Sequence, residues 1–138
     1  MVLGELIPLS FDKIMQTRSY TVIILGCKEK RFAIYTEPSV GRTLQLFLTG
    51  AETPRPLTHE LISRLFLATE IRVMQVVIND LQDTVYFARL FFEQKSGEIS
   101  HIIEMDARPS DCLILALKSN APVFATKKVI DQAIAVED

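Results

Sequence analysis

The chain is 138 residues long, 49% hydrophobic and slightly acidic, with a formal net charge of −2. This length suits one ordinary domain with its own hydrophobic core, so we expect a single domain over residues 1–138. No apolar run reaches the ~18 residues that a membrane-spanning helix needs, so no membrane partner is expected. The acidic balance provides no global basic field. It therefore argues against a high-affinity nucleic-acid binder, but not against an enzyme that contacts phosphates locally and releases its product.

Two features of the sequence bear on the cellular compartment. Residues Met1–Ser10 contain Glu5 and lack a basic segment, so we expect no secretory signal. Cys27 and Cys112 have neither a metal-binding nor a redox spacing. Two cysteines without such a pattern favour a reducing environment, and we predict a cytoplasmic protein.

The first 36 residues are predicted to form three strands. Leu3–Met15 has a strand-like pattern, in which Pro8 either disturbs the pairing or places the segment on a sheet edge. Ser19–Cys27 is rich in β-branched residues, Lys28–Lys30 forms a polar turn, and Arg31–Thr36 follows as a strand. The last two strands are therefore expected to form a hairpin.

Two helices are predicted next. The first follows Glu37-Pro-Ser39, and Gly50 ends it in the manner of a C-cap. The second is expected to begin with Thr58 as its N-cap and with Leu57 and Ile62 as a hydrophobic staple. Apolar spacing predicts that the inward-facing residues are Val40, Leu44, Phe47 and Leu48 in the first helix and Leu61, Leu65 and Ala68 in the second.

The second half of the chain is predicted to begin with three strands. From Ile71 the apolar residues follow a period of two, and tight turns at 81–83 and 95–97 separate this strand from Thr84–Glu93 and Glu98–Asp106. The third of these strands leads directly into a helix.

That helix, Pro109–Ser119, is predicted to be buried. Proline suits its first position, and the run Cys112–Leu117 is apolar on all sides. Ala121–Ala125 is then expected to form a short strand, and Thr126 to open a final helix. Its inward-facing residues are predicted to be Val129, Ile130, Ala133 and Ile134.

The order of the predicted elements indicates an internal repeat. Strands lead into a helix entered through Glu37-Pro-Ser39, and three later strands lead into a helix entered through Arg108-Pro-Ser110. We therefore predict an α+β domain with an antiparallel or mixed sheet and a degenerate βββα repeat. Hairpins of this kind leave an edge strand. Pairing two such edges is a common way to form a twofold dimer, so we also predict a homodimer.

Candidate chemistry is concentrated at the junction before the buried helix. Glu104 and Asp106 alternate at the end of a strand, and Asp111 lies in the first helical turn. These three carboxylates form a candidate site for a divalent cation, Mg²⁺ or Mn²⁺, which readies water to attack a phosphodiester. The alternative for each is a solvated strand end or a helix cap. Arg108 either binds a phosphate through its guanidinium fork or forms an ion pair with Asp106 or Asp111.

A second group of candidates lies at the start of the second helix. His59 is in the first helical turn, where it serves either as a general base or as an ordinary surface histidine. We find no phosphate-binding glycine loop, zinc-ligand spacing, nucleophile elbow or His-Glu-x-x-His helix. Residue types alone therefore indicate an α+β domain with one charged junction.

Two strings of residues extend this interpretation, Arg55-Pro-Leu-Thr-His-Glu-Leu61 and Asp106-Ala-Arg-Pro-Ser-Asp111. Together, at this separation, they resemble the bifunctional nuclease domain, a module of bacteria and plants. The resemblance implies that the protein hydrolyses both DNA and RNA. The sequence departs from the family pattern at Glu60, where aspartate is common, and at Cys112, where alanine is common. The matching polar positions are Thr58, His59, Asp106, Arg108, Ser110 and Asp111.

Three functional hypotheses follow. The leading one is a metal-assisted nuclease of low sequence preference. Its metal ligands are Asp106, Asp111 and Glu104, its catalytic groups include His59 and Arg108, and Ser110 and Thr58 help to bind substrate. The second is a non-catalytic dimeric module that binds a small anionic ligand or a protein, and it is favoured by the acidic net charge. The third is a structural domain whose junction charges serve folding only.

Overall fold

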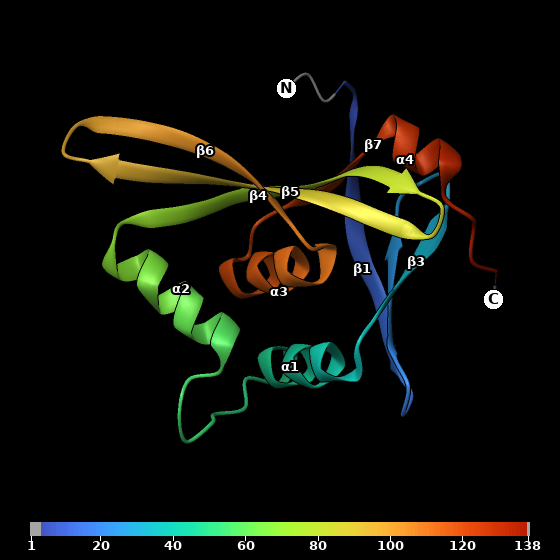
Figure 1. Cartoon of the computed structure of the whole chain (residues 1–138), viewed down its shortest axis with the longest axis horizontal. Helices are drawn as coiled ribbons and strands as arrows, with labels where there is room; N and C mark the ends of the chain where they lie inside the picture. Colours follow the sequence, from blue (N-terminus) through green and yellow to red (C-terminus); the bar gives the residue numbers. More distant parts are fainter. Residues whose placement is uncertain (1–3, 138) are drawn as a thin grey trace.

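The computed structural model describes residues 4–137. Leu3, the predicted start of the first strand, and both ends of the predicted 1–138 domain lie outside these residues. The described chain forms one seven-stranded mixed sheet and four helices, which confirms the predicted α+β class (Figure 1). In chain order these are β1 (Leu6–Gln16), β2 (Thr21–Gly26), β3 (Arg31–Thr36), α1 (Pro38–Thr49), α2 (Thr58–Ala68), β4 (Ile71–Gln82), β5 (Val85–Ser96), β6 (Ile99–Ala107), α3 (Pro109–Ser119), β7 (Val123–Thr126) and α4 (Lys127–Gln132).

The strand order is β3-β2-β1-β7-β4-β5-β6, so two three-stranded antiparallel units flank β7. β7 is antiparallel to β1 and parallel to β4. Each unit leads to a helix with proline in its first turn, Pro38 in α1 and Pro109 in α3. The predicted βββα repeat is therefore present, with α2 inserted between its halves. Pro8 lies in a part of β1 that pairs with β7 but not with β2.

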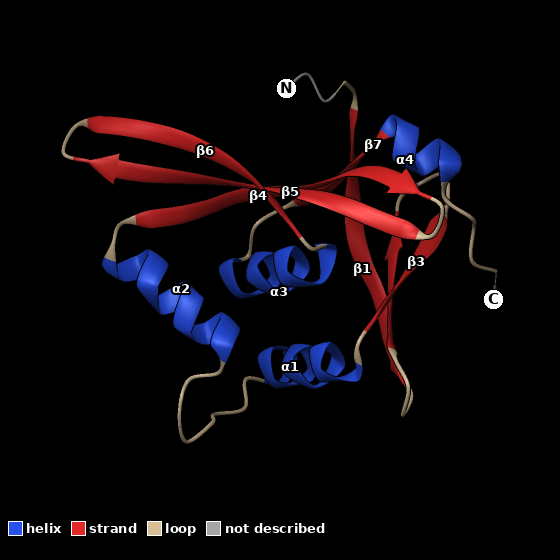
Figure 2. Cartoon of the chain, viewed as in Figure 1, coloured by secondary structure: helices blue, strands red, loops and turns tan. Residues whose placement is uncertain are grey.

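The sheet is strongly bent, and helices α1, α2 and α3 lie in the angle between its two arms, while α4 lies on the other side (Figure 2). The central helix is α3, which contacts α1, α2, β4 and β5. Residues Cys112–Ala116 are buried, as predicted from their all-round apolar pattern. Because α3 is enclosed on several sides, packing fixes where its first turn lies at the junction with β6.

The inward face of α2 was predicted wrongly. Ile62 and Phe66 pack against the core, and Phe66 stacks on Phe92 with ring centroids 5.7 Å apart. The predicted residues Leu61 and Leu65 are instead 52% and 54% exposed, and Ala68 is exposed as well. α2 has two adjacent apolar stripes, and docking against β4 and α3 rather than local spacing determines which one turns inward.

Helix ends account for the remaining differences. The N-cap of α2 is Leu57, so Thr58 is already helical and makes no capping hydrogen bond, contrary to the prediction. Gly50 does end α1, at φ 68°, and the Thr126 side chain caps α4 by accepting a hydrogen bond from the Val129 amide. The exposed residues Leu48 and Ile134 were wrongly assigned to the core: Leu48 faces solvent, and Ile134 lies beyond the end of α4.

Candidate active site

The N-terminal ends of three helices supply the polar cluster at the junction. Glu37 is the N-cap of α1, and Arg108 is the N-cap of α3. His59 is the second residue of α2, and Asp111 is in the first turn of α3. The two N-caps hold equivalent places in the βββα repeat, so the cluster forms where the two halves of the repeat meet.

Asp111 is the centre of this cluster. Its Oδ1 lies 2.8 Å from His59 Nε2, and its Oδ2 accepts a hydrogen bond from Arg108 Nε at 2.9 Å. A second bond, from Arg108 Nη2 to Asp111 Oδ1 at 3.2 Å, completes the fork. Arg108 Nη1 also reaches Glu37 Oε1 at 3.3 Å. The structure therefore brings together three of the predicted residues, His59, Arg108 and Asp111, and adds Glu37.

Charge pairing holds Asp111 in its ionised form. Partial burial raises the pKa of Asp111, but hydrogen bonds from Arg108 and His59 outweigh it and leave the pKa below its ordinary value. The same pairing with Asp111, and more weakly with Glu37, raises the pKa of Arg108. An ionised carboxylate only accepts hydrogen bonds, so His59 Nε2 carries the proton that faces Asp111. The other ring nitrogen, Nδ1, is then unprotonated in the neutral imidazole.

The lowered pKa of Asp111 leads to a stability prediction. A depressed carboxyl pKa stabilises the fold above the unfolded-state value of about 4, and this contribution is lost as pH falls through the folded-state value. We expect Asp111→Asn to lower the free energy of unfolding by roughly 1 kcal/mol at pH 7, allowing for its partial exposure. In urea titrations the difference from wild type should shrink below pH about 4. An equal difference at pH 7 and pH 3 would contradict this account.

The other predicted carboxylates pair elsewhere. Glu104 Oε1 accepts a hydrogen bond from Arg89 Nε at 3.0 Å, and Asp106, 72% exposed, lies 3.9 Å from Arg89 Nη1. In the β5–β6 ladder Arg89 stands directly opposite Asp106, which explains the pairing. Among residues 4–137, no three His, Cys, Asp or Glu side chains are placed to hold one metal ion. The proposed ligands Glu104, Asp106 and Asp111 therefore do not fit one common cation. Arg89 pairs with the first two, and Arg108 pairs with the third.

The exposed Arg108 guanidinium borders a cleft of about 280 Å³ between β3 and the start of β5. The rings of Phe32 on β3 and Tyr86 on β5 stack with their centroids 5.5 Å apart, which joins the two strands beside this cleft. Ser110 also lines the cleft, and it is 5% exposed. His59 and Thr58 are not among the cleft-lining residues, which are Ala33, Ile34, Tyr35, Thr36, Thr84, Val85, Tyr86, Arg108, Pro109 and Ser110.

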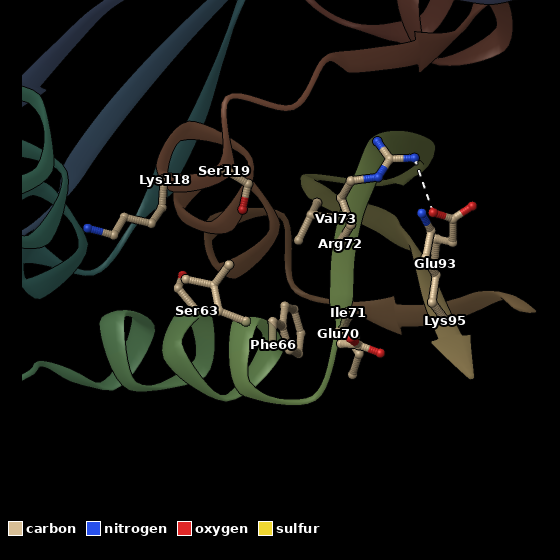
Figure 3. A pocket seen from close by; sticks show the side chains of 11 residues that line it. Ser63, Phe66, Glu70, Ile71, Arg72, Val73, Glu93, Lys95, Lys118 and Ser119 are labelled. Atoms are coloured by element: carbon tan, nitrogen blue, oxygen red, sulfur yellow. Dashed lines mark hydrogen bonds and ion pairs between the residues drawn. The ribbon is translucent and has the colours of Figure 1, made fainter. Parts of the chain in front are cut away.

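A second pocket, of about 460 Å³, lies between α2 and the strands β4 and β5 (Figure 3). Phe66 and Val73 contribute apolar wall, and Arg72 and Glu93 form an ion pair of 3.5 Å at its rim. This pocket shares no residue with the Asp111 cluster. The cleft beside Arg108 is therefore the one associated with the predicted site.

Two residues of this region were not predicted from the sequence. Arg89 lies within a strand and acquires its role only through the register of β5 against β6. Glu37 was noted only as part of the helix entrance, although its repeat-equivalent, Arg108, was singled out. Aligning the two Pro-Ser helix entrances would have indicated that residues 37 and 108 occupy matching positions.

Comparison with known proteins identifies the family of this chain. The class that the fold and the junction define is a βββα-repeat α+β domain with a charged site at its helix entrances. The model of the bifunctional nuclease domain matches residues 23–138, and the chain belongs to this family. Proteins described as uncharacterized from two strains of Mycobacterium tuberculosis, CDC 1551 and H37Rv, are each 31% identical over 123 residues, covering 88% of this chain and 71% of theirs. Within residues 4–137, no helix is long and apolar enough to cross a membrane.

Proposed function

We propose that this protein hydrolyses phosphodiester bonds in DNA and RNA where the Arg108 cleft adjoins the His59–Asp111 pair. The observation that carries the proposal is the hydrogen-bonded series His59–Asp111–Arg108, in which one carboxylate holds both a candidate base and a candidate phosphate ligand. Membership of the bifunctional nuclease family supports nucleic acid as the substrate class. The cytoplasmic location predicted from the sequence stays a prediction.

The geometry supports a specific division of labour. The scissile phosphate binds at the guanidinium of Arg108, whose side chain is 60% exposed, lines the cleft and contacts Asp111. Asp111 orients the imidazole by accepting a hydrogen bond from Nε2–H, so that Nδ1 of His59 can take a proton from water. That water oxygen forms a bond to phosphorus, and the bond to the leaving oxygen breaks. The leaving oxygen takes a proton from solvent, His59 returns its extra proton to solvent, and Arg108 offsets the charge that develops on the phosphoryl oxygens.

The requirement for a divalent cation, Mg²⁺ or Mn²⁺, stays a prediction from the sequence. Since the expected carboxylates do not form a common site, no step above depends on a metal. Cleavage measured in EDTA and after addition of Mg²⁺ or Mn²⁺ would reveal any requirement directly.

The proposal is tested with fluorescent single strands of DNA and RNA. The expected result is cleavage that coelutes with the purified protein through two chromatographic steps. Arg64→Ala, purified in the same way, is a control for the loss of an exposed arginine, because Arg64 is 62% exposed and its ion pair is with Glu60. Absence of strand cleavage by wild-type protein, with and without added cations, would refute the proposed activity.

Glu37 is expected to compete with substrate for Arg108. It is paired with Nη1 at 3.3 Å, and both side chains are at least half exposed. Such an exposed pair contributes about 0.2–1 kcal/mol, so Glu37→Gln should lower KM roughly 1.4- to 5-fold while leaving kcat nearly unchanged. Initial rates over a range of strand concentrations measure this. An increase in KM would show that Glu37 assists binding instead.

We also propose that two copies of the chain associate through a sheet edge. β3 and β6 are the terminal strands, and β6 presents Ile99, Ile102 and Met105 at 61%, 58% and 46% exposure. A dimer would cover these apolar side chains together with an unpaired strand edge. Sedimentation of wild type and Ile102→Asp tests this, with a wild-type dimer and a weakened variant expected. A monomeric wild type at high concentration would rule the dimer out.

A further inference from the structure

An exposed tyrosine stands at the cleft that contains Arg108. Tyr35 lines this cleft, is 66% exposed, and packs edge to face on Tyr20 with ring centroids 5.5 Å apart. Tyr35 lies on β3, opposite Val22 of β2, so its backbone is held by the sheet. A large aromatic ring is thus held in a defined position while most of its surface remains in water.

This combination matches the chemistry of unpaired nucleotides. A base gains about 1–3 kcal/mol by stacking on an aromatic side chain, and it can do so only when its face is not covered by neighbouring bases. The nearby Arg108 guanidinium suits the adjoining phosphate. A cleft of about 280 Å³ is at the small end of ligand pockets, which fits one nucleotide rather than a duplex.

The charge of the protein favours the same substrate. Duplex binding relies on many lysine and arginine contacts to phosphates, whereas this chain has a net charge of −2. Around Arg108 two carboxylates, Glu37 and Asp111, already face a single guanidinium. Affinity at this site therefore has to come from stacking and a few phosphate contacts.

We propose that the cleft selects single-stranded nucleic acid, with one base stacked on Tyr35 and a neighbouring phosphate on Arg108. The proposal rests on the hydrolytic function above and adds the form of the substrate. It makes Tyr35 a binding residue that determines specificity for an unpaired strand.

Binding is measured by fluorescence anisotropy with a phosphorothioate strand that resists cleavage, and with its duplex. Wild type should bind the single strand more tightly, with a salt slope of about −0.7 to −1.4 in the log–log plot for one or two phosphates. Tyr35→Ala should weaken single-strand binding roughly 5- to 150-fold, while Tyr35→Phe should retain it. Leu67→Ala, which alters a 79% exposed side chain on α2, is the control and should bind as wild type does.

The outcomes separate this inference from the proposed hydrolysis. Cleavage by wild type, together with unchanged single-strand binding by Tyr35→Ala, overturns the inference alone. Duplex binding equal to or tighter than single-strand binding also overturns it. Tyr35-dependent binding of the single strand without any cleavage supports the inference and refutes hydrolysis. Failure of wild type to bind the strand refutes the inference whatever the cleavage assay shows.

Discussion

His59→Gln is expected to lower kcat for strand cleavage roughly 10²- to 10⁴-fold, the range found when a general base is lost. Glutamine retains an N–H donor for Asp111, so the 2.8 Å contact can be kept while the proton acceptor at Nδ1 is removed. His59 is 16% exposed, and this substitution limits any loss of packing. Single-turnover rates with saturating strand measure the chemical step.

Three controls accompany this prediction. Thermal unfolding should show that His59→Gln is folded, and its KM should change little. Added imidazole should restore part of the activity of His59→Ala, because a free base can then occupy the vacated space. Asp111→Asn should also lower kcat, because a neutral amide in place of the carboxylate orients the imidazole less well and allows the wrong tautomer. If His59→Gln cleaves at the wild-type rate, His59 has only a structural role.

Arg108→Ala is expected to lower kcat/KM roughly 10²- to 10³-fold, the loss typical when one donor to a developing oxyanion is removed. Arg108→Lys should recover only part of this loss, because a lysine keeps the charge but lacks the planar fork. The effect on stability should be within about 1 kcal/mol, since the arginine is 60% exposed. Steady-state cleavage and thermal unfolding of both variants provide the measurements.

The matched control for Arg108→Ala is Arg64→Ala. Arg64 has similar exposure, 62%, and also pairs with a carboxylate on its own helix, Glu60 at 3.0 Å. It should leave kcat/KM unchanged. Equal cleavage by Arg108→Ala and Arg64→Ala would remove Arg108 from the mechanism and leave its ion pairs with Asp111 and Glu37 as features of folding alone.

Local sequence was sufficient to predict most elements of this protein. The βββα repeat followed from strand-length apolar runs and from the two Pro-Ser helix entrances, and the burial of α3 followed from a run that is apolar on every side. These signals act over a few residues, because hairpin turns, caps and side-chain periodicity are short-range properties. His59, Arg108 and Asp111 were also identified as candidates from the sequence, although His59 and Asp111, which are in contact, are 52 residues apart in the chain.

Only the tertiary structure decided which of the charges from separate elements meet. The register of β5 against β6 pairs Arg89 with Glu104 and Asp106, and the packing of α1 and α2 on α3 brings Glu37 and His59 to the local Arg108–Asp111 pair. The docking of α2 turned Phe66 inward and left Leu65 in solvent. Each of these outcomes depends on strand register or helix docking between separate elements, and the local periodicity of apolar residues specifies neither of them.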